Sequence, residues 1–208
     1  MKRIAWIALA LLLALTLSGC QRQVEEEEPV PNPIATITMQ DGSVMRFELR
    51  PDCAPNTVAN FVKLANSGFY DGLQFFRVVV GAFIQGGDPL NNGTGDPGYA
   101  IKGEFAANGV QNTLSHSRGV ISMARQSGYD TAGSQFFILQ GNFPADYDGL
   151  YAAFGTALDE ATIGVIDTIA GQPADTSYRP ITRQIIATIR VETFDVEYEP
   201  ETLERVKK

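Results

Sequence analysis

The residues that most often carry metal, redox or triad chemistry are scarce in this sequence. Its 208 residues include one histidine, one tryptophan and two cysteines. A protein metal site draws several ligands from clustered histidine, cysteine and carboxylate side chains, and a lone histidine makes a poor site. We therefore expect no metal and no cofactor, and we interpret His116, the single histidine, as a structural or surface residue.

Positive charge is scarce as well. The 16 lysine and arginine residues stand against 24 aspartate and glutamate residues, which gives a formal net charge of −8. A nucleic-acid-binding protein presents a basic stripe to phosphate, so nucleic acid is not an expected partner. The length suits one domain with extra material at its ends, and we expect a monomer.

Charged residues are absent from residues 4–17, an apolar run that follows Lys2 and Arg3. A basic start, a short apolar stretch and small residues at its end are typical of a secretory signal, and a spanning helix needs about 20 apolar residues. The run ends in Leu-Ser-Gly-Cys at residues 17–20. This ending resembles the bacterial lipobox, whose cysteine becomes the lipidated first residue of the mature protein. An ordinary secretory signal that contains a cysteine is the alternative.

We therefore predict that residues 1–19 are a lipoprotein signal peptide and that Cys20 carries the lipid. The protein is then expected to be anchored in the cell membrane, facing the extracytoplasmic side. With Cys20 lipidated, Cys53 has no partner, so the fold must hold without an internal disulfide. Residues 20–33 contain four consecutive glutamates and three prolines, and we interpret them as an acidic tether.

Short alternating or apolar runs follow, separated by turn residues. Asp41-Gly42 lies between two alternating runs within residues 34–49, which predicts a hairpin. An apolar stripe at helical spacing predicts a helix over residues 55–68, and a weaker one spans 163–169. Further strands are predicted within residues 75–86, 119–125, 133–139, 152–154 and 185–194. The charged residues 195–208 are expected to form a loose tail.

These elements predict an all-β barrel or sandwich, because many short strands accompany only two helices. Closure into a barrel would remove exposed strand edges. Residues 88–104 are rich in glycine, asparagine and proline but lack the Gly-Lys-Ser/Thr ending of a phosphate loop. We interpret them as a long ordered surface loop.

One arginine interrupts the apolar run at residues 75–88, which reads FFRVVVGAFIQGGD. On an extended strand Arg77, Phe83 and Gln85 share one face, and Gln135 and Phe137 share a face of another predicted strand. A cation and two amides beside aromatic rings would form a groove. The plain alternative is that Arg77 pairs with a carboxylate at the edge of the sheet, since a buried arginine needs a partner.

Five segments in order resemble the cyclophilin-type peptidyl-prolyl cis-trans isomerases. They read FFRVVVGAFIQGGDP, GYAIKGEF, RGVISMAR, AGSQFFI and DGLYAAFG, and the resemblance covers a domain of residues 34–194. It implies a closed eight-stranded antiparallel barrel capped by two α-helices. It also implies an enzyme that accelerates rotation about X-Pro bonds in proline-containing polypeptides.

The resemblance further implies which residues form the site. Arg77 corresponds to the family's catalytic arginine, and Gln85 corresponds to the first glutamine of its groove. The implied substrate-binding residues are Phe83, Ala124, Arg125, Gln135, Phe137, Tyr147 and Tyr151.

Four positions depart from the family's pattern. Ala82 and Phe83 stand where Phe-Met or Phe-Val is usual, so one wall of the proline pocket is expected to be trimmed. Asp146 stands where an aromatic residue or histidine is frequent, and we expect weak cyclosporin binding. Phe76 replaces a usual histidine.

We therefore expect an isomerase that assists the folding of exported proteins. A peptide-binding or chaperone module with little turnover is the alternative, which Ala82 and Asp146 favour and which Arg77, Gln85 and Phe137 oppose. A structural surface protein with an unused groove does not explain the cation and two amides beside the aromatic rings.

Overall fold

Nine strands join into one sheet in the computed structural model, which describes residues 30–204. The predicted signal peptide, Cys20 and most of the predicted tether lie outside the described residues. The strands of the sheet are β1 (Ile34–Met39), β2 (Val44–Leu49), β3 (Gln74–Phe75), β4 (Arg77–Val79), β5 (Phe83–Gly86), β7 (Val120–Met123), β8 (Phe136–Leu139), β9 (Ala152–Ala157) and β10 (Gln184–Glu192). Their order is β3-β10-β1-β2-β9-β7-β8-β5-β4, and every pairing is antiparallel.

The sheet closes on itself through β3 and β4. Only Phe76 separates these two strands, and its N–H donates to the Gln85 carbonyl at 3.0 Å. Counted as one interrupted strand, they pair with β10 at one end and with β5 at the other. The nine segments therefore form an eight-stranded closed barrel, which confirms the predicted architecture.

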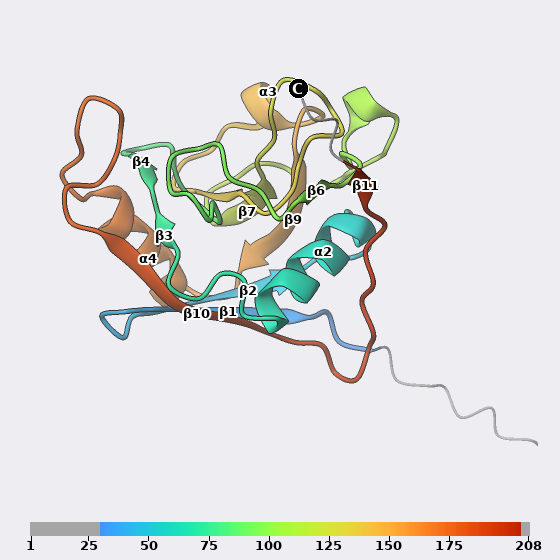
Figure 1. Cartoon of the computed structure of the whole chain (residues 1–208), viewed down its shortest axis with the longest axis horizontal. Helices are drawn as coiled ribbons and strands as arrows, with labels where there is room; N and C mark the ends of the chain where they lie inside the picture. Colours follow the sequence, from blue (N-terminus) through green and yellow to red (C-terminus); the bar gives the residue numbers. More distant parts are fainter. Residues whose placement is uncertain (1–29, 205–208) are drawn as a thin grey trace, which may run out of the picture. The chain divides into compact units, whose positions relative to one another are not determined.

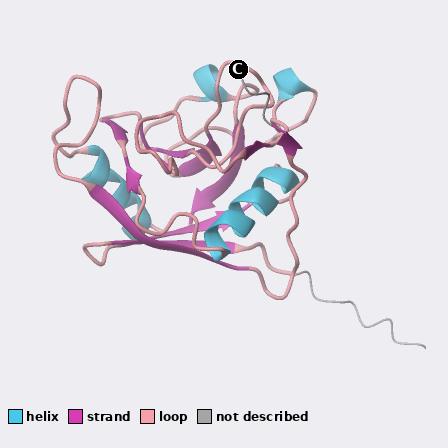
Figure 2. Ribbon diagram, in the orientation of Figure 1, coloured by secondary structure: helices cyan, strands magenta, loops and turns pink. Residues whose placement is uncertain are grey.

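Two long helices lie against this barrel, as the sequence predicts. They are α2 (Pro55–Asn66) and α4 (Glu160–Ala170), and Figure 1 shows them on opposite sides of the barrel. The apolar stripe of α2 is buried, and Asp159 caps α4 by accepting a hydrogen bond from the Thr162 N–H at 2.7 Å. Two short helices, α3 (Pro144–Tyr147) and the 3-10 helix η1 (Ala106–Asn108), interrupt the loops in Figure 2. Within the described residues, no helix has the length and apolar character needed to cross a membrane.

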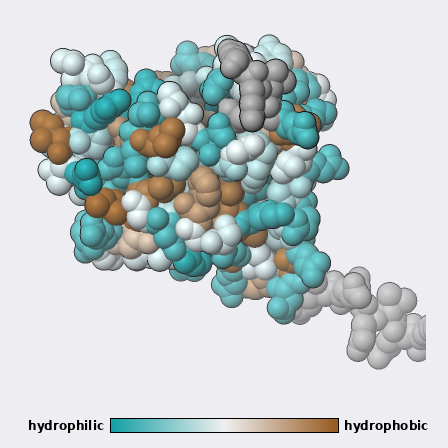
Figure 3. Space-filling view, viewed as in Figure 1, coloured by the Kyte–Doolittle hydropathy of each residue, from teal (hydrophilic) through white to brown (hydrophobic). Residues whose placement is uncertain are grey.

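The core has two parts on opposite faces of the sheet. The larger part fills the barrel and includes Phe61 of α2, whose ring meets Phe136 edge-on at 5.6 Å. The smaller part lies outside the barrel on β7, β8 and β9, around Phe137. Every residue of β7 and of β8 is buried, because both faces of these strands are covered. On the face shown in Figure 3, the remaining hydrophobic patches are separate and small.

The C-terminal segment is bound to the barrel rather than loose. Its strand β11 (Leu203–Glu204) pairs with β6 (Tyr99–Ala100), and Glu199 forms an ion pair with Lys63 at 2.7 Å. The prediction of a loose tail is wrong for residues up to 204, because its polar groups find partners on α2 and on the surface loop. The end of the predicted tether also belongs to the domain, since the Pro33 carbonyl accepts a hydrogen bond from Leu49.

A buried glutamate distant in sequence caps α2. The helix has no side-chain cap of its own, and the Glu104 carboxylate accepts hydrogen bonds from the N–H groups of Asn56 at 3.0 Å and Thr57 at 2.7 Å. It also accepts one from the Thr57 hydroxyl at 2.6 Å. The negative charge thus meets the positive end of the helix dipole where water is largely excluded.

Glu104→Ala should therefore lower the free energy of unfolding by about 1–3 kcal/mol, because two buried N–H groups lose their acceptor. Urea denaturation measures this change. Glu199→Gln is the matched control, since its carboxylate is 77% exposed and an ion pair in solvent contributes little to stability. Equal losses in the two variants would contradict the capping role of Glu104.

Candidate functional site

A hairpin places the predicted cation and its amide partner directly opposite each other. The sequence suggests one continuous strand over residues 75–86, but the chain turns at Gly81, which has φ of 79°, and the Ala82 N–H donates to Val79 at 2.9 Å. Strands β4 and β5 then pair Arg77 with Gln85. The predicted shared face is therefore present, but cross-strand pairing creates it rather than alternation along one strand.

Strand β8 extends this face and supplies its aromatic floor. Gln85 on β5 lies opposite Phe137 on β8. The Phe137 ring lies 5.7 Å from Phe83, and it meets the Tyr151 ring edge-on at 5.6 Å. Tyr147 contacts Phe137 at 5.6 Å from the end of α3. These rings form an apolar cup that opens outward from the barrel.

The cup is a hollow of about 240 Å³, here called the aromatic hollow. Its lining contains every predicted site residue of the barrel except one glutamine: Arg77, Phe83, Gln85, Ala124, Arg125, Phe137, Tyr147 and Tyr151. Gln135 lines an adjoining hollow of about 100 Å³, which shares Gln85, Ala124 and Arg125 with the first. The structure thus brings all the predicted catalytic and substrate-binding residues together.

Arg77 is held by neutral groups. None of the ion pairs among the described residues includes it, which contradicts the interpretation of Arg77 as a structural ion-pair partner. Its guanidinium carbon lies 5.0 Å from the centre of the Phe83 ring and 5.7 Å from that of Tyr178. Its Nη1 is 3.4 Å from Gln85 Oε1. The positive charge therefore remains uncompensated by a carboxylate.

A relay of amides orients Gln85 toward this arginine. Gln85 Nε2 donates to Gln135 Oε1 at 3.1 Å, and Gln135 Nε2 donates to the Gly95 carbonyl at 2.9 Å. Because each amide nitrogen is used in this direction, the Gln85 oxygen is left to face Arg77. A backbone carbonyl on the surface loop thus fixes the orientation of both amides.

The surface loop is itself organised by a buried carboxylate. Asp88 is fully buried and accepts hydrogen bonds from the N–H groups of Leu90 at 2.8 Å, Asn92 at 3.0 Å and Gly93. A side chain at Gly95 would clash with this carboxylate, because a Cβ there would lie 2.0 Å from Asp88 Oδ1. The predicted long ordered loop therefore also carries the last acceptor of the amide relay.

Arg125 is enclosed by aromatic rings. Its guanidinium carbon lies 4.8 Å from the ring centre of Tyr151, 5.2 Å from that of Phe105 and 5.3 Å from that of Tyr129. Its Nε also donates to the Leu150 carbonyl at 3.0 Å. The sequence suggested only that this backbone binds substrate, whereas the side chain also holds the Tyr151 rim in place. Phe105 and Tyr129 were missed because they lie in loops without periodicity.

The single histidine supports the aromatic floor from behind. His116 is 1% exposed, and its ring stacks on Phe137 with centroids 6.2 Å apart. Its Nδ1 lies 2.7 Å from Asp148 Oδ1 and its Nε2 lies 2.9 Å from Ser122 Oγ. Although these are the residue types of a hydrolytic triad, Ser122 is fully buried and cannot reach a substrate. His116 is therefore a structural residue, which is one of the two roles that the sequence predicts for it.

Burial and hydrogen bonding together set the protonation of His116 and Asp148. Burial lowers the pKa of His116 below 6.5, against the opposing effect of Asp148. For Asp148 burial raises the pKa, but hydrogen bonds from Ser115 and from the backbone and ring of His116 together outweigh it and lower that pKa overall. The neutral imidazole is therefore the form that the folded protein favours near neutral pH.

The departures from the family's pattern have smaller effects than the sequence suggested. Ala82 does not line the aromatic hollow, so the predicted trimmed wall is absent there and Phe83 forms that side. Asp146 is exposed, and the neighbouring Tyr147 contributes the ring. Tyr178, which lies over Arg77, was missed altogether, because it sits in an irregular loop at φ of 62°.

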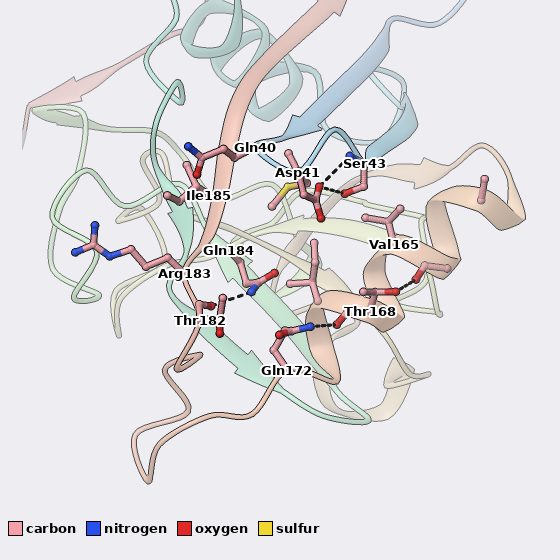
Figure 4. Close-up of a pocket in the computed structure, with 14 residues that line it drawn as sticks. Gln40, Asp41, Ser43, Val165, Thr168, Gln172, Thr182, Arg183, Gln184 and Ile185 are labelled. Atoms are coloured by element: carbon pink, nitrogen blue, oxygen red, sulfur yellow. Dashed lines mark hydrogen bonds between the residues drawn. The ribbon is translucent and has the colours of Figure 1, made fainter.

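A larger hollow lies elsewhere. It measures about 530 Å³ and lies between the β1–β2 turn, α4 and the start of β10 (Figure 4). Several of its polar side chains are engaged with their own segments: Asp41 accepts from Ser43, and Gln172 donates to the Thr168 carbonyl. It contains no aromatic ring, so it lacks the chemistry that the smaller aromatic hollow concentrates.

Known proteins resemble this chain along the whole barrel. A family model described as cyclophilin type peptidyl-prolyl cis-trans isomerase matches residues 34–191. Peptidyl-prolyl cis-trans isomerase B of Bacillus subtilis is 50% identical over 117 residues, covering 56% of this chain and 78% of that protein. A peptidyl-prolyl cis-trans isomerase of Helicobacter pylori is 43% identical over 147 residues, which cover 71% of this chain and 86% of that protein. The crystal structure of a Cryptosporidium parvum cyclophilin-type isomerase superposes on this chain with a TM-score of 0.67 and 32% sequence identity. The match covers 76% of this chain and 98% of that one.

The buried His116 predicts how stability depends on pH. Because its folded pKa is lowered, the unfolded chain takes up a proton first as the pH falls through 6.5, and the folded state loses stability. Unfolding free energies should therefore decrease between about pH 7.5 and about pH 5.5, with a slope of at most ~1.4 kcal/mol per pH unit. Urea titrations at each pH measure it.

His116→Gln is the matched variant, since it removes the chain's only histidine and with it the side chain that ordinarily titrates in this interval. This variant should be less stable at neutral pH, but its free energy of unfolding should change less with pH. The same slope in both proteins would contradict the assignment.

Proposed function

The chain belongs to the cyclophilin-type peptidyl-prolyl cis-trans isomerases, and from that premise we propose that it isomerises X-Pro bonds in exported polypeptides. It works as a monomeric folding factor on the extracytoplasmic side of the cell membrane, held there by lipid on Cys20. The basic start, apolar run and Leu-Ser-Gly-Cys ending at residues 17–20 support this location. The acidic, proline-containing residues that follow support a tether between anchor and barrel.

The observation that carries the mechanism is an arginine without a carboxylate partner at the rim of an aromatic hollow. Resonance gives the peptide C–N bond a rotation barrier of about 18–20 kcal/mol. At the twisted state the prolyl nitrogen loses conjugation and accepts a hydrogen bond more readily. A guanidinium beside that nitrogen binds the twisted form better than either planar form, and this difference lowers the barrier. Arg77 is the residue in this role, and it stays charged at any physiological pH.

The other residues hold the substrate around Arg77. The proline ring enters the aromatic hollow and packs on Phe137 and Phe83. Gln85 keeps its oxygen toward Arg77 through the amide relay, so the guanidinium is oriented before the substrate arrives. Ala124 and Arg125 present backbone groups to an extended peptide. The Cryptosporidium parvum relative was crystallised in the presence of the dipeptide Ala-Pro, which supports a proline-containing ligand for this barrel.

Arg77→Ala should lower kcat/KM on X-Pro peptides by about 10²–10³-fold, the usual effect of removing one preorganised donor. Arg77→Lys should lose nearly as much, because an ammonium lacks the planar fork. NMR exchange spectroscopy measures the rates, and thermal melts run beside it should show a folded barrel. Arg183→Ala, at an exposed arginine of the hollow beside α4, is the matched control.

Undiminished turnover by folded Arg77→Ala would overturn this mechanism. If the wild type binds proline peptides but isomerises none of them, the peptide-binding module becomes the better description.

Lipidation is tested on the mature N-terminus. Mass spectrometry of the protein from a bacterial membrane fraction should find Cys20 as the first residue, carrying acyl groups. Cys20→Ser should abolish the modification and release the protein from the membrane fraction. Cys53→Ser is the control that should retain both, since Cys53 is a buried free thiol in the turn between β2 and α2. A mature protein that begins elsewhere or has an unmodified Cys20 would exclude the anchor.

A further inference from the structure

A fourth hollow adjoins the aromatic hollow at Arg77. It measures about 290 Å³ and is here called the arginine groove. Its lining residues are Phe76, Arg77, Gln85, Asn92, Gly93, Ser177 and Arg179. It shares Arg77 and Gln85 with the aromatic hollow, so a polypeptide whose proline lies on Phe137 passes beside it. Two guanidinium groups from distant parts of the chain therefore face one space next to the reacting bond.

An ordered loop places the second arginine. Residues 173–181 connect α4 to β10, and within them Ala174 pairs with Pro180 while Asp175 N–H donates to the Arg179 carbonyl at 2.9 Å. The Tyr178 carbonyl accepts a hydrogen bond from Val78 of β4 at 2.8 Å. This loop, drawn in orange beside β4 in Figure 1, is thus closed on itself and attached to the strand that carries Arg77. The position of Arg179 follows from this framework.

The charges of the arginine groove are unbalanced. Neither Arg77 nor Arg179 takes part in an ion pair among the described residues, and no carboxylate lines the groove. Asp175 is the acidic residue on the loop, and its Oδ1 accepts hydrogen bonds from the backbone N–H groups of Ser177 at 2.8 Å and Arg179 at 3.0 Å. The buried Asp88 likewise gives both oxygens to backbone N–H groups of its own loop. Asp88 is therefore engaged within its own loop, whereas Asp175 attracts Arg179 through space without forming an ion pair with it.

We propose that the arginine groove is a specificity subsite for an aspartate or glutamate side chain of the substrate, close in sequence to the isomerised proline. The inference rests on the proposed isomerase function of Arg77 and adds a substrate preference to it. Guanidinium groups match a carboxylate through paired N–H donors, and two of them face the groove. The acidic surface of the rest of the chain does not prevent this, since charges beyond about 8 Å are largely screened at physiological salt.

The test compares matched peptides in which one residue is glutamate or glutamine. The varied residue is placed in turn at each of the two positions before and the two positions after the proline. Turnover is measured by NMR exchange, and affinity is measured by titration of the same full-length protein. At one or more positions the wild type should prefer glutamate by about two- to fivefold, the size expected for a solvent-exposed ion pair, and added salt should reduce the preference.

Variants assign the preference to the groove. Arg179→Gln should bring the glutamate-to-glutamine ratio close to one, and Arg179→Glu should invert it. Arg183→Gln removes another exposed arginine, which lines the separate hollow beside α4, and it should keep the wild-type ratio. Thermal melts establish that each variant is folded.

An active wild type without glutamate preference at any position would overturn the subsite while leaving the isomerase intact. A preference that persists in Arg179→Gln would overturn it as well. If no peptide is isomerised, the isomerase function fails instead, and the titrations still decide whether the groove selects glutamate.

Discussion

The site depends on keeping one positive charge in place without neutralising it. A carboxylate would fix Arg77 firmly, but it would also occupy the N–H donors and compensate the charge that the proposed mechanism directs at a twisted peptide nitrogen. Two aromatic rings and one amide oxygen do the positioning instead. The position of Arg77 therefore depends on residues farther out. The Gln85 amide is oriented by Gln135, and Gln135 is oriented by the Gly95 carbonyl. That carbonyl lies on a loop that is ordered around the buried Asp88.

The aromatic floor of the site must also be rigid, although it lies on the outside of the barrel. Phe137 lies on a strand whose alternate side chains, Phe136 and Ile138, fill the barrel interior, and its own ring is backed by the buried His116. Hydrophobic packing on both faces of β8 therefore fixes the floor, in contrast to a binding surface built on loops alone. The rim is softer, since Tyr147 and Tyr151 come from a short helix and the start of a strand, and Arg125 joins them by its contacts with rings and carbonyls.

The sequence allowed the barrel, its helices and every residue of the aromatic hollow to be predicted, because alternation, turn residues and family motifs report local structure. It failed where contacts join distant segments. Tyr178 and Arg179 lie in an irregular loop, so nothing local indicates that they face Arg77. The hairpin at Gly81 was read as one strand because the apolar run continues through the turn. The charge of the C-terminal tail predicts a loose segment, whereas its strand β11 pairs with β6 on the surface loop.

The pairing of β1 with both β2 and β10 has a consequence for the order of folding. The first strand of the barrel finds one neighbour within a few residues, but its other neighbour is the last strand of the sheet. Joining the two requires closing a loop of nearly the whole domain, which is entropically costly and slow compared with forming a hairpin. While the chain is being made, β1 keeps one unpaired edge until β10 has emerged. The barrel therefore closes only after β10, the last strand of its sheet, has emerged.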